Sequence, residues 1–82
     1  MTLKFDLVSK QGCHLCEDFL HALTCLKVEM KLDFDCHVLD IQQDKALQVQ
    51  FSDKIPVLLF QGEMVCHYYL VPEAVITLCQ GR

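Results

Sequence analysis

Apolar and polar residues alternate at the start of the chain and then change to a helical spacing. From Leu3 to Ser9 the apolar side chains recur at every second position, which predicts a β-strand. Lys10-Gln11-Gly12 then closes the strand. From Cys16 to Met30 the apolar residues recur every three or four positions, with acidic residues in the first turn, as in an amphipathic helix. These patterns predict a strand that leads through a short turn directly into a helix.

Two short apolar segments in the second half of the chain predict a hairpin. Val57–Phe60 and Met64–Tyr69 have strand-like composition and are bounded by polar or turn residues. Gln61-Gly62 between them suits a tight turn, so we expect the two strands to pair antiparallel. Because neighbouring side chains on a strand point to opposite faces, we expect one of Tyr68 and Tyr69 to face the core. The other would face solvent and could border a site.

The remaining segments complete the order of elements. Phe34–Ile41 contains β-branched and aromatic residues between polar ones and predicts a strand. Gln42–Asp53 predicts a short helix that Asp44 caps. Pro72 at the start of an apolar pattern and Gly81 past its end are typical of a final helix.

The predicted order is therefore βαβαββα. A helical crossover places the first two strands parallel and adjacent in one sheet, whereas the hairpin adds an antiparallel pair. We expect an α/β fold of thioredoxin or glutaredoxin type, with a four-stranded mixed sheet and helices on both faces. A chain of 82 residues is too short for two independent cores, so residues 1–82 are expected to form one glutaredoxin-like domain.

Composition and charge exclude several classes of function. Hydrophobic residues make up 52% of the chain, which predicts an ordered core. The net charge is -4 and no segment gathers several Lys or Arg residues, so we expect no nucleic-acid partner. The longest apolar runs, such as Ile55–Phe60, fall far short of the roughly 20 residues that cross a bilayer. Without a signal segment at the N-terminus, we expect a cytoplasmic protein that does not associate with membranes.

The six cysteines fall into two groups. Four lie within segments patterned as helix or strand, where cysteine usually acts as a small buried hydrophobe; they are Cys25, Cys36, Cys66 and Cys79. Only Cys13 and Cys16 lie at a turn. A disulfide scaffold depends on a secreted context, for which the sequence shows no signal. The pair at the turn is therefore the candidate for chemistry.

Cys13-His14-Leu15-Cys16 has the spacing of a redox-active dithiol. Residues three apart in a helical turn bring their α-carbons within disulfide range. Cys13 at the helix N-terminus would be favoured as a thiolate, which attacks disulfides, and Cys16 would resolve the mixed disulfide. The same spacing is also half of a zinc site, and a purely structural role is a third interpretation.

Charges around the dithiol oppose one another. Lys10, and His14 when it is protonated, would favour the thiolate of Cys13. Glu17 and Asp18 lie within one turn of it and disfavour a second negative charge. The sequence therefore predicts only weakly the direction in which the pKa of Cys13 shifts.

Two motifs resemble those of a known family. Ser9-Lys10-Gln11-Gly12-Cys13-His14-Leu15-Cys16-Glu17 and Lys54-Ile55-Pro56-Val57-Leu58 look like segments of the small bacterial glutaredoxin-like proteins of the thioredoxin superfamily. The resemblance implies a thiol-disulfide oxidoreductase that serves cell redox homeostasis. It also implies a cis Pro56 that faces the cysteine pair, and an Ile55 backbone that receives an extended substrate. With these two residues, Lys10 and His14 are the candidate substrate-binding residues.

The chain departs from the glutaredoxin pattern at two places. His14-Leu15 replaces Pro-Tyr between the cysteines, and Cys66–Glu73 replaces the Gly-Gly-x-Asp segment that holds glutathione. We expect no resident cofactor or metal. Protein disulfides and small-molecule disulfides are both candidate substrates. Glutathione and a thioredoxin-reductase-type donor are both candidate reductants. The alternative function is a non-catalytic binding module, for a protein partner or for metal held through Cys13 and Cys16.

Overall fold

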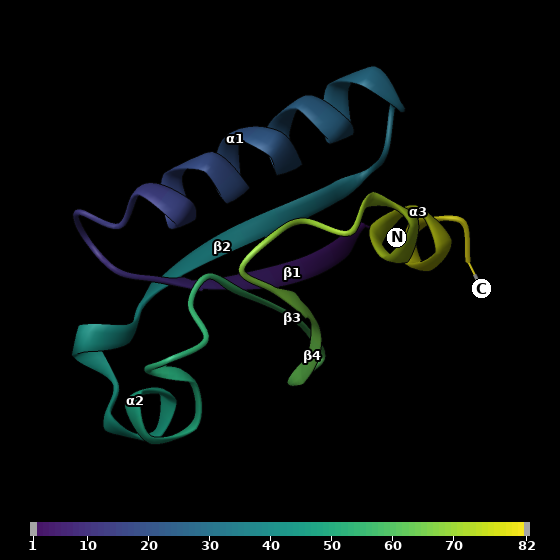
Figure 1. Cartoon of the computed structure of the whole chain (residues 1–82). Helices are drawn as coiled ribbons and strands as arrows, with labels where there is room; N and C mark the ends of the chain where they lie inside the picture. Colours follow the sequence, from purple (N-terminus) through teal and green to yellow (C-terminus); the bar gives the residue numbers. More distant parts are fainter. Residues whose placement is uncertain (1, 82) are drawn as a thin grey trace.

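The computed structural model describes residues 2–81, whose strands form one mixed sheet in the order β2-β1-β3-β4 (Figure 1). The elements are β1 (Leu3–Ser9), α1 (His14–Glu29), β2 (Phe34–Asp40), a 3-10 turn (Ile41–Gln43), α2 (Lys45–Phe51), β3 (Val57–Phe60), β4 (Glu63–His67) and α3 (Pro72–Cys79). β1 and β2 are parallel, and the other two pairs are antiparallel. Within the described residues, the predicted βαβαββα order and four-stranded mixed sheet are confirmed.

Two apolar clusters cover the two faces of the sheet. The larger cluster joins the sheet to α1 and α3 and consists of Phe5, Leu7, Phe19, Leu23, Phe34, Leu58, Cys66 and Val75. The smaller cluster consists of Val8, Ile41, Val57 and Leu59, with Leu47 and Phe51 of α2 packed against it. Leu7 and its neighbour Val8 are both fully buried because β1 is a central strand covered on both sides. Helices therefore cover both faces, as predicted (Figure 1).

Local sequence signals place the helix ends. The carboxylate of Asp44 accepts a hydrogen bond from the backbone N–H of Leu47 at 3.2 Å, which confirms the predicted cap of α2. Pro72 is the first residue of α3, as expected. Among residues 2–81, the helices are too short or too polar to traverse a lipid bilayer.

Two predicted strands end earlier than expected. β2 stops at Asp40, because the Asp40 carboxylate accepts a hydrogen bond from the N–H of Gln42 at 2.9 Å and starts the 3-10 turn. β4 stops at His67, because Tyr68 adopts a left-handed backbone conformation with φ of 64°. The expectation that one of the two tyrosines faces the core is wrong: Tyr68 is 40% exposed and Tyr69 is 70% exposed. Leaving the strand removes the alternation on which that expectation rested.

Candidate active site

A tight turn delivers the cysteine pair from β1 to the start of α1. The backbone N–H of Cys13 donates to the carbonyl of Lys10 at 3.2 Å and closes the turn. Gly12 has a φ of 81°, in the left-handed region that glycine adopts without a steric penalty. Cys13 follows with an extended backbone as the N-cap of α1, so its side chain lies at the helix N-terminus.

Cys13 performs the capping role that serine, threonine or aspartate usually fills. Its Sγ accepts a hydrogen bond from the backbone N–H of Cys16 at 3.2 Å. The N-terminal end of a helix also carries partial positive charge, which stabilises an anion there. The start of α1 therefore supplies the Cys13 sulfur with a backbone N–H donor.

Cys16 lies one turn further along and differs from Cys13 in its environment. Cys16 is only 4% exposed, whereas Cys13 is partly exposed, and both are free thiols. Burial raises the pKa of the Cys16 thiol from 9.0 to about 11, helped by a side-chain hydrogen bond with Cys13 and by the negative charges of Cys13 and Glu17. A backbone hydrogen bond at Lys10 acts in the opposite direction. Cys16 is therefore a protonated thiol at neutral pH.

The four predicted substrate-binding residues take different positions. Lys10 and Ile55 line one cavity of about 460 Å³ on the side of α2. Pro56 is buried, and the bond that joins it to Ile55 is cis, as the family resemblance implied. His14 is exposed at the first position of α1 and is not part of this cavity. The structure thus brings Lys10 and Ile55 together, although they are far apart in the sequence.

A groove borders α1 on its other side. We call it the loop groove; it has a volume of about 340 Å³ and is lined by Leu15, Asp18, Phe19, Ala22, Tyr68, Tyr69, Leu70 and Pro72. The sequence pattern singled out the two tyrosines but placed them on a strand. Their position opposite α1 depends on the chain leaving β4 at Tyr68, for which the sequence carries no clear signal.

Hydrogen bonds join the loop after β4 to the segment before β3. The N–H of Tyr68 donates to the carbonyl of Pro56 at 2.9 Å, and its hydroxyl donates to the carbonyl of Asp53. The N–H of Tyr69 donates to the carbonyl of His67 at 2.7 Å. These bonds hold one wall of the loop groove in place.

The other four cysteines lie away from the turn. The Sγ of Cys25 is 3.6 Å from Nε2 of His21 on an exposed part of α1. Burial raises the pKa of the thiols of Cys36, Cys66 and Cys79. In the part of the chain that the structure describes, no cluster of three or more His, Cys, Asp or Glu side chains is arranged to hold a metal ion.

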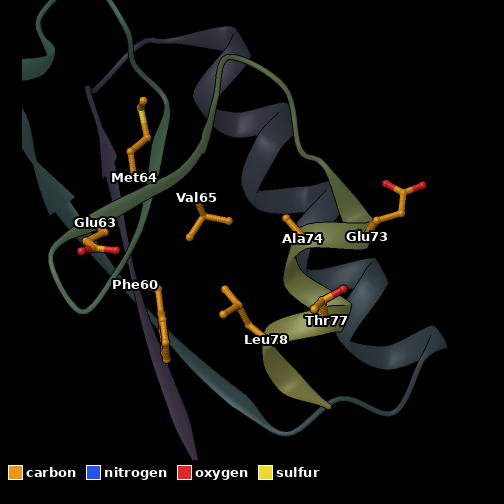
Figure 2. Close-up of a pocket in the computed structure, with 8 residues that line it drawn as sticks. All are labelled: Phe60, Glu63, Met64, Val65, Glu73, Ala74, Thr77 and Leu78. Carbon is orange, nitrogen blue, oxygen red and sulfur yellow. The ribbon is translucent and has the colours of Figure 1, made fainter. Parts of the chain in front are cut away.

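A larger cavity, of about 480 Å³, lies between the β3–β4 hairpin and α3. Figure 2 shows Val65, Ala74 and Leu78 lining its interior, with the carboxylates of Glu63 and Glu73 at its edges. Its lining contains none of the cysteines and no residue of the turn between β1 and α1.

Comparison with known proteins agrees with the fold. The model of the glutaredoxin-like domain (DUF836) family matches residues 4–78. Among solved structures, protein Ne2328 from Nitrosomonas europaea is 27% identical with a TM-score of 0.85, and 96% of this chain and 93% of that chain are covered. Protein XcR50 from X. campestris is 20% identical with a TM-score of 0.69, and 95% of this chain and 97% of that chain are covered.

A malarial protein shares the fold as well, at 16% identity and a TM-score of 0.62, with 98% of this chain and 96% of that chain covered. No curated protein matches the sequence at a significant level. The family match covers every element of the described fold apart from the ends of β1 and α3. The chain therefore belongs to the glutaredoxin-like (DUF836) family.

Proposed function

We propose that this protein is a cytoplasmic thiol-disulfide oxidoreductase that uses Cys13 and Cys16 for disulfide exchange in cell redox homeostasis. The observation that carries the proposal is the unequal environment of the two sulfur atoms. Cys13 accepts an amide N–H at the start of α1, whereas Cys16 is buried and stays protonated. Such a pair divides into an attacking sulfur and a resolving sulfur.

The reaction begins at Cys13. Its thiolate attacks one sulfur of a substrate disulfide, so that a mixed disulfide forms, the substrate S–S bond breaks and the leaving thiolate takes up a proton. Cys16 then loses its proton and attacks the Sγ of Cys13. The Cys13–Cys16 disulfide forms, the second substrate thiol leaves, and two electrons have passed to the substrate.

The causes of the Cys16 pKa shift impose an order on these steps. The hydrogen bond with Cys13 and the charge of Cys13 both keep Cys16 protonated. Both are lost when Cys13 enters the mixed disulfide, so the pKa of Cys16 falls at the step where its thiolate is needed. Burial still opposes ionisation, and Cys16 therefore stays unreactive toward other reagents.

The surrounding residues supply candidate contacts to the substrate. Lys10 would attract a carboxylate of the substrate, and the backbone at Ile55 would pair with an extended substrate chain beside Pro56. His14 would act through its charge at the start of α1. The oxidised protein needs a reductant, for which we propose glutathione or a thioredoxin-reductase-type donor.

The test is a redox titration of the metal-free protein against defined thiol buffers, with mass spectrometry to identify which cysteines pair. We expect a reversible Cys13–Cys16 disulfide with a potential between those of thioredoxin and glutaredoxins, roughly -270 to -200 mV. The Cys25→Ser variant is the matched control on the same helix and should titrate like the parent chain.

The opposite result would favour the alternative function. If no Cys13–Cys16 disulfide forms across this range, or if both thiols coordinate added zinc instead, the oxidoreductase proposal is wrong. The chain would then act as a binding module for a protein partner or a metal through the same turn.

A further inference from the structure

The loop groove contains neither Cys13 nor Cys16, but its lining includes Leu15, which directly precedes Cys16 in the chain. Leu15, which lies between the two cysteines in the sequence, is 37% exposed and forms part of its lining. Tyr69 is 70% exposed on the opposite wall. When a ligand covers apolar and aromatic side chains of this size, their burial stabilises the complex.

The groove has a wall that is already in place before a ligand binds. Two hydrogen bonds from Tyr68, to the carbonyls of Pro56 and Asp53, attach the loop to the segment before β3. Pro72 begins α3 immediately after the loop. Binding of a ligand in this groove therefore costs little free energy for ordering the loop.

The place of Leu15 in the chain relates this groove to the proposed chemistry at Cys13. Leu15 lies two residues after Cys13 and one before Cys16. Because consecutive residues of an extended chain are only about 3.3 Å apart, the residues next to a substrate cysteine bound to Cys13 stay within a short distance of it. A side chain next to the reactive cysteine can therefore enter the space between Leu15 and Tyr69.

Charge limits what can occupy the groove. Of its lining residues, all of which lie within the described part of the chain, Asp18 is the one with a charged side chain. A carboxylate placed there would meet the negative charge of Asp18 without a cation to balance it. The groove therefore favours an uncharged apolar group over the carboxylates of glutathione.

We infer that the loop groove selects disulfides of proteins or peptides that carry a bulky apolar residue next to the reactive cysteine. This inference rests on the proposed oxidoreductase function and names its substrate class. Leu15 and Tyr69 are specificity-determining residues that contact the substrate side chain, whereas Tyr68 is a positioning residue that holds the loop.

The experiment measures the first exchange step with three probes. Two are short uncharged peptides, with leucine or with serine on both sides of one cysteine, each activated as a mixed disulfide with thionitrobenzoate; the third is the same mixed disulfide of glutathione. Stopped-flow absorbance gives the second-order rate constants. We expect the leucine peptide to react about tenfold faster than the serine peptide, and glutathione to react no faster than the serine peptide.

Variants separate recognition from reactivity. Tyr69→Ser should remove most of the preference for leucine, measured as the ratio of the rate constants with the leucine and serine peptides. Val71→Ser is the matched control, because Val71 is an exposed apolar residue of the same loop that does not line the groove. Alkylation of Cys13 by iodoacetamide should be the same in both variants and in the parent chain.

Failure of this inference can be distinguished from failure of the proposed function. Equal rates with all three probes, faster reaction with glutathione, or equal effects of Tyr69→Ser and Val71→Ser would overturn the groove as a specificity site while exchange itself persists. A changed alkylation rate in Tyr69→Ser would also overturn it, since the residue would then act on the thiol. Absence of exchange with every probe would instead reject the oxidoreductase function.

Discussion

The turn Ser9–Cys16 and the loop Tyr68–Val71 both supply residues to the loop groove but contribute different things. The turn carries the two sulfur atoms and is closed by short-range hydrogen bonds, from Cys13 to Lys10 and from Cys16 to Cys13. The loop carries exposed aromatic side chains and is held by bonds to residues more than ten positions away in the sequence. In the proposed function, the locally encoded segment carries out the chemistry, and the segment that depends on the tertiary fold recognises the substrate.

β3 connects the two regions. Leu58 lies opposite Leu7 of β1, which leads into the turn, and opposite Cys66 of β4, which leads into the loop. Leu58 is fully buried in the larger apolar cluster. The relative position of the turn and the loop therefore depends on the packing of this central strand.

The largest expected effect comes from removing the attacking sulfur in the turn. Cys13→Ser should reduce peptide disulfide exchange to the uncatalysed rate, because a serine hydroxyl does not attack disulfides at neutral pH. Cys16→Ser should leave the first step intact and accumulate a mixed disulfide on Cys13, which mass spectrometry detects. Cys25→Ser serves as the control and should keep the parent rate. Equal activity in all three variants would contradict the division of roles within the turn.

Truncating the connecting strand should damage both regions at once. Leu58→Ala leaves a cavity in the larger cluster and should lower the free energy of unfolding by about 2 to 5 kcal/mol, measured by urea denaturation. Val49→Ala, at a position that is 87% exposed, should change it by less than about 0.5 kcal/mol. A Leu58→Ala loss no larger than that of Val49→Ala would show that β3 does not hold the two regions together.

Alkaline pH should lower the free energy of unfolding, because Cys16 ionises there. The pKa of Cys16 is about 11 in the folded state and 9.0 for an unperturbed cysteine thiol. The folded state therefore favours the protonated thiol. This contribution is fully present below pH 9 and is lost as the pH rises to 11; by linkage it amounts to about 3 kcal/mol. Urea denaturation from pH 8 to 11 measures it, with Cys16→Ser as the reference. If the free energy of unfolding changes equally with pH in the parent protein and in Cys16→Ser, the assignment to Cys16 is wrong.

The smallest effect is expected from one hydroxyl in the loop. Tyr68→Phe removes the hydrogen bond to the Asp53 carbonyl and should cost about 1 kcal/mol of stability. It should also reduce the preference for the leucine peptide, because the loop is less firmly held. Tyr69→Phe keeps the ring and should preserve both stability and preference. If Tyr68→Phe matches Tyr69→Phe in both measurements, the hydroxyl does not position the loop.

The sequence by itself determined the order of elements, the turn with its dithiol and the caps at Asp44 and Pro72. These features depend on patterns within a few residues: alternation, helical spacing, and side chains that bond to the nearest backbone amides. The motif around Pro56 also allowed its cis bond to be expected from family resemblance. Such features are short-range, so they can be predicted from one chain without knowledge of its packing.

Tertiary structure alone decided where β4 ends, how the two tyrosines are exposed and which residues share a cavity. Tyr68 leaves the strand and bonds to Pro56 and Asp53, and Lys10 and Ile55 meet because β1 and β3 are adjacent in the sheet. The high pKa of Cys16 has the same origin, since burial, its largest cause, exists only after the elements pack. Alternation and spacing carry no information about contacts between residues that are distant in the sequence, and those contacts form the wall of the loop groove.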